Sequence, residues 1–171
     1  MIEVEIAGIR MEMPSQQPMV ALRALDPNDL VLTILIGSQE ATAIAFALEG
    51  VQTPRPMTHD LLVLTLSATG FLVSHVVISQ IVEGTFYADL HLSNPQTGFS
   101  PIVSCRPSDA LALASRVECA IYVAEEVFEV AGVVEGHADE GDEVLRGDPP
   151  EEVVEEFRQF IDQVNPEDFA S

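Results

Sequence analysis

The sequence predicts an α+β protein with a mostly antiparallel sheet packed with several short helices. Apolar, β-branched runs are separated by turn signals such as Asp26-Pro27-Asn28-Asp29, a pattern typical of strands joined by tight connections. Between these runs, alanine-rich and leucine-rich stretches that end at glycine indicate short helices. Beyond an acidic stretch near the C-terminus, apolar residues at helical spacing indicate one further, amphipathic helix.

The first half of the chain begins with three strands, at residues 2–13, 19–25 and 30–36, in an antiparallel opening. Gly37 to Glu40 then leads into a helix at 41–49, whose alternate alanines predict a buried position. A stiff Pro54-Arg55-Pro56 connector precedes a leucine-rich helix at 59–68, for which Thr58 is the expected N-cap.

The second half reads as a meander followed by short alternating elements. Strands are expected at 71–82, at 85–93 and in a run that ends at Cys105. In the second of these, alternation places Phe86, Ala88, Leu90 and Leu92 on one face and Tyr87, Asp89 and His91 on the other. A helix over Pro107–Val117 with Ser108 as a candidate cap, a strand at 121–123 and a helix at 125–131 complete this part.

Composition divides the chain into three parts. Residues 1–132 form the predicted globular domain, residues 133–149 an acidic flexible linker, and residues 150–171 a C-terminal amphipathic helix and tail. The apolar stripe of that helix consists of Val153, Val154, Phe157, Phe160, Ile161 and Val164. Because so amphipathic a helix needs an apolar surface, we expect it to dock on the domain or on a neighbouring subunit.

The charge is strongly negative. All seven basic residues are arginine, against 28 acids, which gives a formal charge of −21. Such a charge opposes an encounter with nucleic acid. Residues 132–171 hold 13 of the acids and 2 of the arginines, about half of the excess. Cys105 and Cys119 lack zinc-type spacing and are expected to be buried, reduced thiols. No stretch approaches the ~18 apolar residues of a membrane span, and we expect a cytoplasmic protein.

Three segments in this order resemble the bifunctional nuclease family, formerly a domain of unknown function. They are Ile36-Gly37-Ser38-Gln39-Glu40-Ala41, Pro54-Arg55-Pro56-Met57-Thr58-His59-Asp60-Leu61 and Arg106-Pro107-Ser108-Asp109-Ala110. The resemblance covers roughly residues 2–133 and implies an α+β fold built on a twisted sheet, self-association, and the DNase and RNase activity of some members. Many relatives have an acid two residues before the motif arginine, where this chain has Ser104. A metal site that used this acid would be weaker here.

A nuclease without lysine would most simply hold Mg²⁺ or Mn²⁺ with carboxylates. Each motif offers one acid, namely Glu40, Asp60 and Asp109, so the site would be assembled between motifs. The alternative is that each acid only complements the positive end of its helix, because all three lie in first helical turns. Glu49 lies on the opposite face of the helix from Glu40 and cannot share a metal with it.

Three further groups have both a catalytic and a structural interpretation. His59 is a candidate general base or metal ligand, or a packed or capping residue. Arg106 either binds a phosphate or pairs with Asp109. Asp89 and His91 form either a ligand pair or part of a solvated sheet face.

Two functions therefore remain open. The first is a metal-dependent nuclease, DNase or RNase, with His59, Asp60, Arg106 and Asp109 as catalytic residues and Glu40, Asp60 and Asp109 as metal ligands. The second is a non-catalytic, self-associating binding or regulatory protein with a degenerate site. In both cases the expected partner is a second copy of the chain, in a dimer or a larger homo-oligomer.

Overall fold

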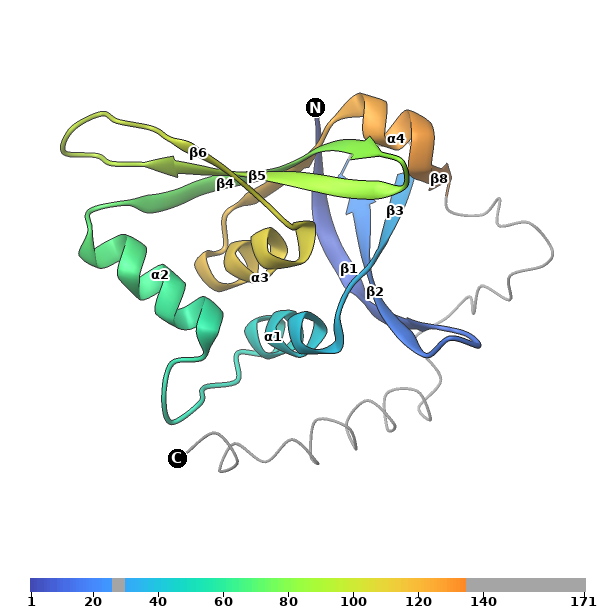
Figure 1. Cartoon of the computed structure of the whole chain (residues 1–171), viewed down its shortest axis with the longest axis horizontal. Coiled ribbons are helices and arrows are strands. Elements are labelled where there is room, and N and C mark those ends of the chain that lie inside the picture. The colour runs from blue at the N-terminus through green and yellow to red at the C-terminus, as the bar shows by residue number, and fades with distance from the viewer. Residues whose placement is uncertain (26–29, 135–171) are drawn as a thin grey trace.

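A computed structural model of the chain describes residues 1–25 and 30–134. In these residues, eight strands form one sheet and four helices pack on it (Figure 1). The elements in chain order are β1 (Ile2–Glu12), β2 (Gln17–Ala24), β3 (Leu30–Leu35), α1 (Ser38–Leu48), α2 (Thr58–Ala68), β4 (Leu72–Val82), β5 (Thr85–Ser93), β6 (Ile102–Cys105), α3 (Pro107–Val117), β7 (Ala120–Val123), α4 (Glu125–Ala131) and β8 (Gly132–Val134). The predicted C-terminal helix and nearly all of the predicted linker lie outside the described residues.

The sheet has the strand order β6-β5-β4-β7-β1-β2-β3-β8. It consists of two meanders, β1–β2–β3 and β4–β5–β6, with β7 inserted between them. Every pairing is antiparallel except that of β4 with β7, which is parallel. The predicted α+β class with a mostly antiparallel sheet is thus confirmed.

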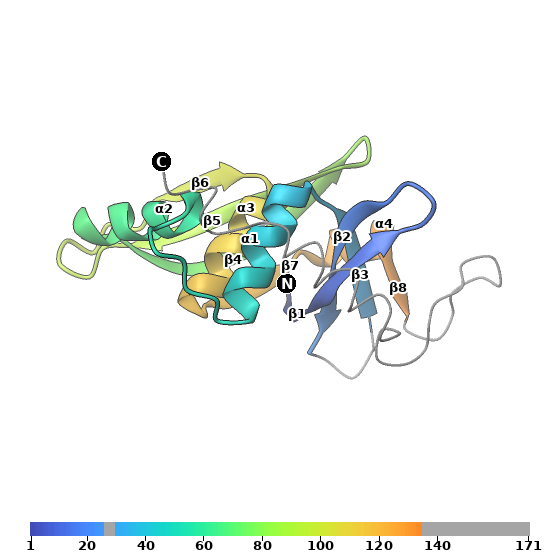
Figure 2. The same cartoon turned by 90° about the horizontal axis from the view of Figure 1, so that it is seen from below.

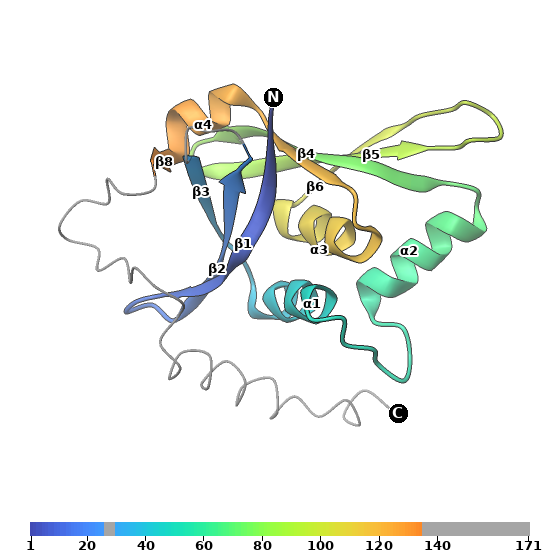
Figure 3. The same cartoon turned by 180° about the vertical axis from the view of Figure 1, so that it is seen from behind.

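The core lies between the sheet and the helices. The predicted alternation along β5 is confirmed, because Ala88, Leu90 and Leu92 are buried while Tyr87 is exposed. Helix α1 buries a continuous run of small and apolar residues, as its alanines predicted. Helix α3 packs against both α1 and α2 (Figure 2), whereas α4 packs against β4, β3 and β8 (Figure 3).

The expected caps of two helices are wrong by one or two residues. The N-cap of α2 is Met57, because the Asp60 carboxylate accepts a hydrogen bond of 2.8 Å from the Met57 amide and so draws Thr58 into the first turn. The N-cap of α3 is Arg106, since Pro107 takes the first helical position that suits its fixed φ. Ser108 is consequently a buried residue of the first turn.

Strand β8 carries the sheet two residues beyond the predicted domain boundary at Gly132. It pairs with β3, with Leu30 opposite Val134. A side chain at position 132 would collide with the backbone of Phe128, so glycine is required where α4 turns into β8. Both cysteines are free and are half-buried instead of fully buried. Among the described helices, none is long and apolar enough to cross a membrane.

Candidate functional site

Arg106 lies at the corner between β6 and α3 and joins two helices. Its Nε donates to Asp109 Oδ2 at 2.8 Å, and its Nη2 donates to Asp109 Oδ1 at 3.1 Å and to Glu40 Oε1 at 2.8 Å. The side chain is 67% exposed, whereas that of Glu40 is 18% exposed. The predicted pairing of Arg106 with Asp109 is therefore present, and the guanidinium still faces solvent.

Glycine at position 37 lets the Glu40 carboxylate reach Arg106. A Cβ built on Gly37 would collide with Glu40 Oε2. Because the carboxylate is the far end of a flexible side chain, the collision would move Glu40 and leave the backbone in place. The Gly37-Ser38-Gln39-Glu40 segment thus begins α1 and also leaves room for the Glu40 carboxylate to contact Arg106.

His59 reaches the same carboxylate from α2. Its Nε2 lies 3.3 Å from Asp109 Oδ1, and its side chain is only 13% exposed. We call Glu40, His59, Arg106 and Asp109 the Asp109 cluster. It takes Glu40 from the first of the three predicted motifs, His59 from the second, and Arg106 and Asp109 from the third, and Asp109 is its centre.

The Asp109 cluster stabilises the charged forms of Asp109 and Arg106. Partial burial alone would raise the pKa of Asp109, but hydrogen bonds from Arg106 and His59 and the charges of these residues outweigh it, so this pKa lies below its usual value. The same hydrogen bond to Asp109, with the charges of Asp109 and Glu40, raises the pKa of Arg106. Asp109 is consequently ionised at neutral pH.

Asp60 is not part of this cluster. It accepts a hydrogen bond from Arg116 Nε, and Arg116 also donates to the carbonyl oxygens of Ala43 at 3.0 Å and Ala112 at 2.9 Å. The Arg116 side chain is 9% exposed. Sequence reasoning missed Arg116, because an arginine in the last turn of a helix is ordinarily explained by the negative end of that helix.

Each of the three carboxylates predicted as metal ligands is paired with an arginine. Glu40 and Asp109 share the single charge of Arg106, and Asp60 pairs with Arg116. In residues 1–25 and 30–134, no three side chains of His, Cys, Asp or Glu are grouped so that they could hold a metal ion. The metal-binding role of Glu40, Asp60 and Asp109 therefore stays a prediction.

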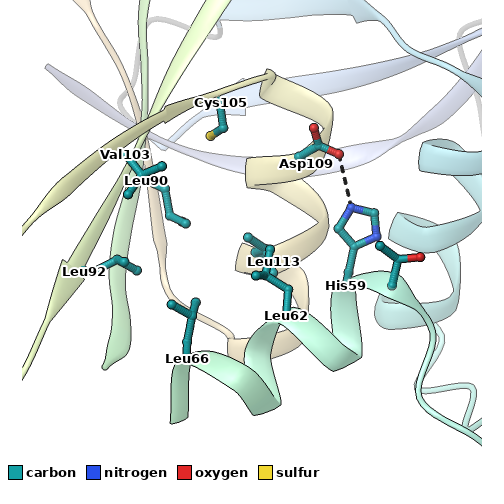
Figure 4. Close-up of a pocket in the computed structure, with 10 residues that line it drawn as sticks. His59, Leu62, Leu66, Leu90, Leu92, Val103, Cys105, Asp109 and Leu113 are labelled. Atoms are coloured by element: carbon teal, nitrogen blue, oxygen red, sulfur yellow. Dashed lines mark hydrogen bonds and ion pairs between the residues drawn. The ribbon is translucent and has the colours of Figure 1, made fainter. Parts of the chain in front are cut away.

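An apolar pocket of about 290 Å³ opens beside the His59–Asp109 pair (Figure 4). Its walls come from α2, α3, β5 and β6. The lining residues are Thr58, His59, Leu62, Leu66, Leu90, Leu92, Val103, Cys105, Asp109 and Leu113. Burial, followed by the charges of Asp109 and Asp89, raises the pKa of Cys105 to about 11. That thiol is protonated at neutral pH and is not a nucleophile.

Asp89 and His91, the other pair of candidate ligands, lie on the opposite face of the sheet. His91 alternates with the pocket residues Leu90 and Leu92, so it points away from the Asp109 cluster. The His91 ring stacks on that of His75, with ring centroids 4.1 Å apart, and Tyr122 packs edge-on against His75 at 5.7 Å. Sequence analysis did not predict this histidine pair.

Comparison with known proteins agrees with the family resemblance of the three sequence motifs. A family model described as the bifunctional nuclease domain matches residues 20–136. An uncharacterized protein of Mycobacterium tuberculosis (strain H37Rv) is 44% identical over 169 residues, which cover 99% of this chain and 98% of that protein. Bifunctional nuclease 1 of Oryza sativa subsp. japonica is 27% identical over 107 residues, 61% of this chain and 32% of the rice protein. The chain therefore belongs to the bifunctional nuclease domain family.

Proposed function

We propose that this chain is a nuclease that hydrolyses phosphodiester bonds of RNA or DNA at the Asp109 cluster. One observation carries the proposal: a single carboxylate, Asp109, holds both a histidine and an arginine at the edge of a pocket. An orienting acid, a proton-transfer group and a cation for phosphate are the parts that this reaction needs. Family membership supports the same reaction class.

Arg106 is proposed to bind the phosphate. A guanidinium presents a planar set of donors that matches phosphate oxygens. Nε and Nη2 are used by Asp109 and Glu40, while Nη1 makes no hydrogen bond to any residue that the structure describes. Its two N–H donors are free for the non-bridging oxygens, and Glu40 and Asp109 fix the plane of the group.

His59 is proposed as the general base. Asp109 accepts the Nε2 proton, which leaves the Nδ1 lone pair to take the proton of the attacking hydroxyl. As the new oxygen–phosphorus bond forms, the bond to the leaving oxygen breaks, and that oxygen takes a proton from solvent. We propose Mg²⁺ or Mn²⁺ only as ions that reduce the repulsion between the acidic protein and the nucleic acid. An ion bound by Glu40 and Asp109 would first have to displace Arg106.

The test is cleavage of RNA and single-stranded DNA oligonucleotides by the full chain, with Mg²⁺, with Mn²⁺ and with EDTA. His59→Ala should lower the rate by roughly 10²–10⁴-fold, the usual range for loss of a general base. Arg106→Ala and Asp109→Asn should lower it as well. His91→Gln is the matched control, because it changes a histidine on the opposite face of the sheet.

Equal cleavage by His59→Ala and wild-type protein would contradict the site assignment. No cleavage by the wild-type chain under any of the three conditions would contradict the nuclease function itself.

The second candidate, a non-catalytic self-associating protein, is favoured by a different observation. Helix α2 buries none of its residues, and Leu61, Leu62 and Leu64 are 59%, 41% and 54% exposed. So many exposed leucines on one helix are typical of a surface that binds another protein segment. An inactive but oligomeric wild-type protein would favour this candidate.

A further inference from the structure

The pocket beside the Asp109 cluster is part of a groove along helix α2. One wall is α2, the other is formed by β5 and β6, and α3 forms the floor (Figure 4). Leu62 on the first wall is 41% exposed and Val103 on the second is 45% exposed. Leu113 of α3 is buried at the floor. The groove is therefore an apolar channel between a helix and a strand edge, the shape that receives an amphipathic helix.

We propose that residues 150–164 of the same chain bind in this groove. The apolar residues of this segment recur every three to four positions from Val153 to Val164. As a helix, these 12 residues would measure about 18 Å. The part of α2 that lines the groove, residues 58–66, has a length of about 13 Å by the same rule. The apolar stripe is thus long enough to cover the whole of this wall.

The connection is long enough for the segment to reach the groove. Fifteen residues, 135–149, separate it from the end of β8. Fully extended, they span at most about 50 Å. A domain of this size has a radius of gyration of about 14 Å, so the connection can reach any part of its surface. Tethering also gives an effective concentration of the order of mM, which favours the chain's own segment over a separate molecule.

The inference concerns binding and does not depend on the proposed nuclease activity. The binding step can be measured without any substrate.

Hydrogen exchange of the full chain, read by mass spectrometry, tests this binding. In the wild-type protein, backbone amides of residues 150–164 should exchange at least tenfold more slowly than those of an unstructured peptide. Leu62→Asp places a charge in the groove and should remove this protection. Leu64→Asp is the matched control, because Leu64 lies on the same helix but does not line the pocket. Phe157→Asp should act like Leu62→Asp.

Rapid exchange throughout residues 150–164 of the wild-type chain would overturn the proposal. So would equal loss of protection in Leu62→Asp and Leu64→Asp. Protection that disappears on dilution would also overturn it, because it would identify a second copy of the chain as the occupant of the groove.

Discussion

His75 and His91 stack on the face of the sheet opposite the Asp109 cluster, and this stacking makes the stability of the fold depend on pH. Burial lowers the pKa of His75, and the charge of His91 lowers it further. The unfolded chain therefore binds a proton more readily than the folded one, and stability falls as the pH drops through the unfolded pKa of about 6.5.

We expect a lower urea midpoint at pH 5.5 than at pH 7.5 in the wild-type chain. His75→Gln, which cannot be protonated, should reduce this difference. The same pH dependence in the variant and the wild type would show that another group is responsible.

Some residue contacts of the candidate site could be predicted from sequence and others could not. Arg106 and Asp109 are three residues apart at a helix start, so local geometry alone makes their pairing an expected alternative. The contact of His59 with Asp109 joins residues 50 positions apart and depends on how α2 packs against α3. Nothing in the local pattern of either helix contains that information.

Arg116 holds the helices of the site together. It donates to Asp60 at the start of α2, to Ala43 in α1 and to Ala112 in its own helix. Because the side chain is nearly buried, removal of the guanidinium leaves the Asp60 carboxylate without its charged donor and takes one of the donors of each carbonyl oxygen away.

Arg116→Met is expected to destabilise the fold by about 2–4 kcal/mol, the usual range for loss of one partner of a largely buried charged pair. Urea denaturation measures this change, with the exposed Arg55→Met as the control. Asp60→Asn should have a smaller effect, because its side chain is 34% exposed. A loss below 1 kcal/mol in Arg116→Met would show that α2 is held mainly by apolar packing.

At the scale of elements, periodicity and turn signals located nearly every strand and helix. Helix caps were less predictable, since the cap of α2 depends on which nearby carboxylate reaches an amide, and Asp60 reaches that of Met57. Exposure was not predictable either. The leucine content of α2 resembles that of a buried helix, yet α3 takes the larger share of the packing against β4 and β5, and α2 packs mainly against β4 and α3.

For the whole molecule, exposed apolar residues and a high net charge have opposing effects on self-association. Edge strand β6 exposes Ile102 at 60% on the face away from the groove. A formal charge of −21 opposes contact between copies.

We therefore expect an oligomer whose average mass, measured by sedimentation velocity, increases with salt concentration. Ile102→Asp should shift it toward the monomer, whereas Val130→Asp, on the exposed face of α4, should not. A monomer at all salt concentrations would contradict self-association.

The overall strand order could not be obtained from the sequence. Hairpins follow from local turns, so both meanders could be predicted, but the strand that joins them is β7, which returns after α3. Its four residues contain no signal that specifies which two earlier strands it separates.

That position of β7 has a consequence for protein synthesis. Until residues 120–123 have been translated, β1 and β4 each present an unpaired edge, and the two meanders share no strand. Unpaired edges are where nascent chains associate wrongly. The late arrival of this strand thus makes the interval between translation of β4 and of β7 the period of greatest aggregation risk. Slower decoding of residues 83–119 should increase the insoluble fraction.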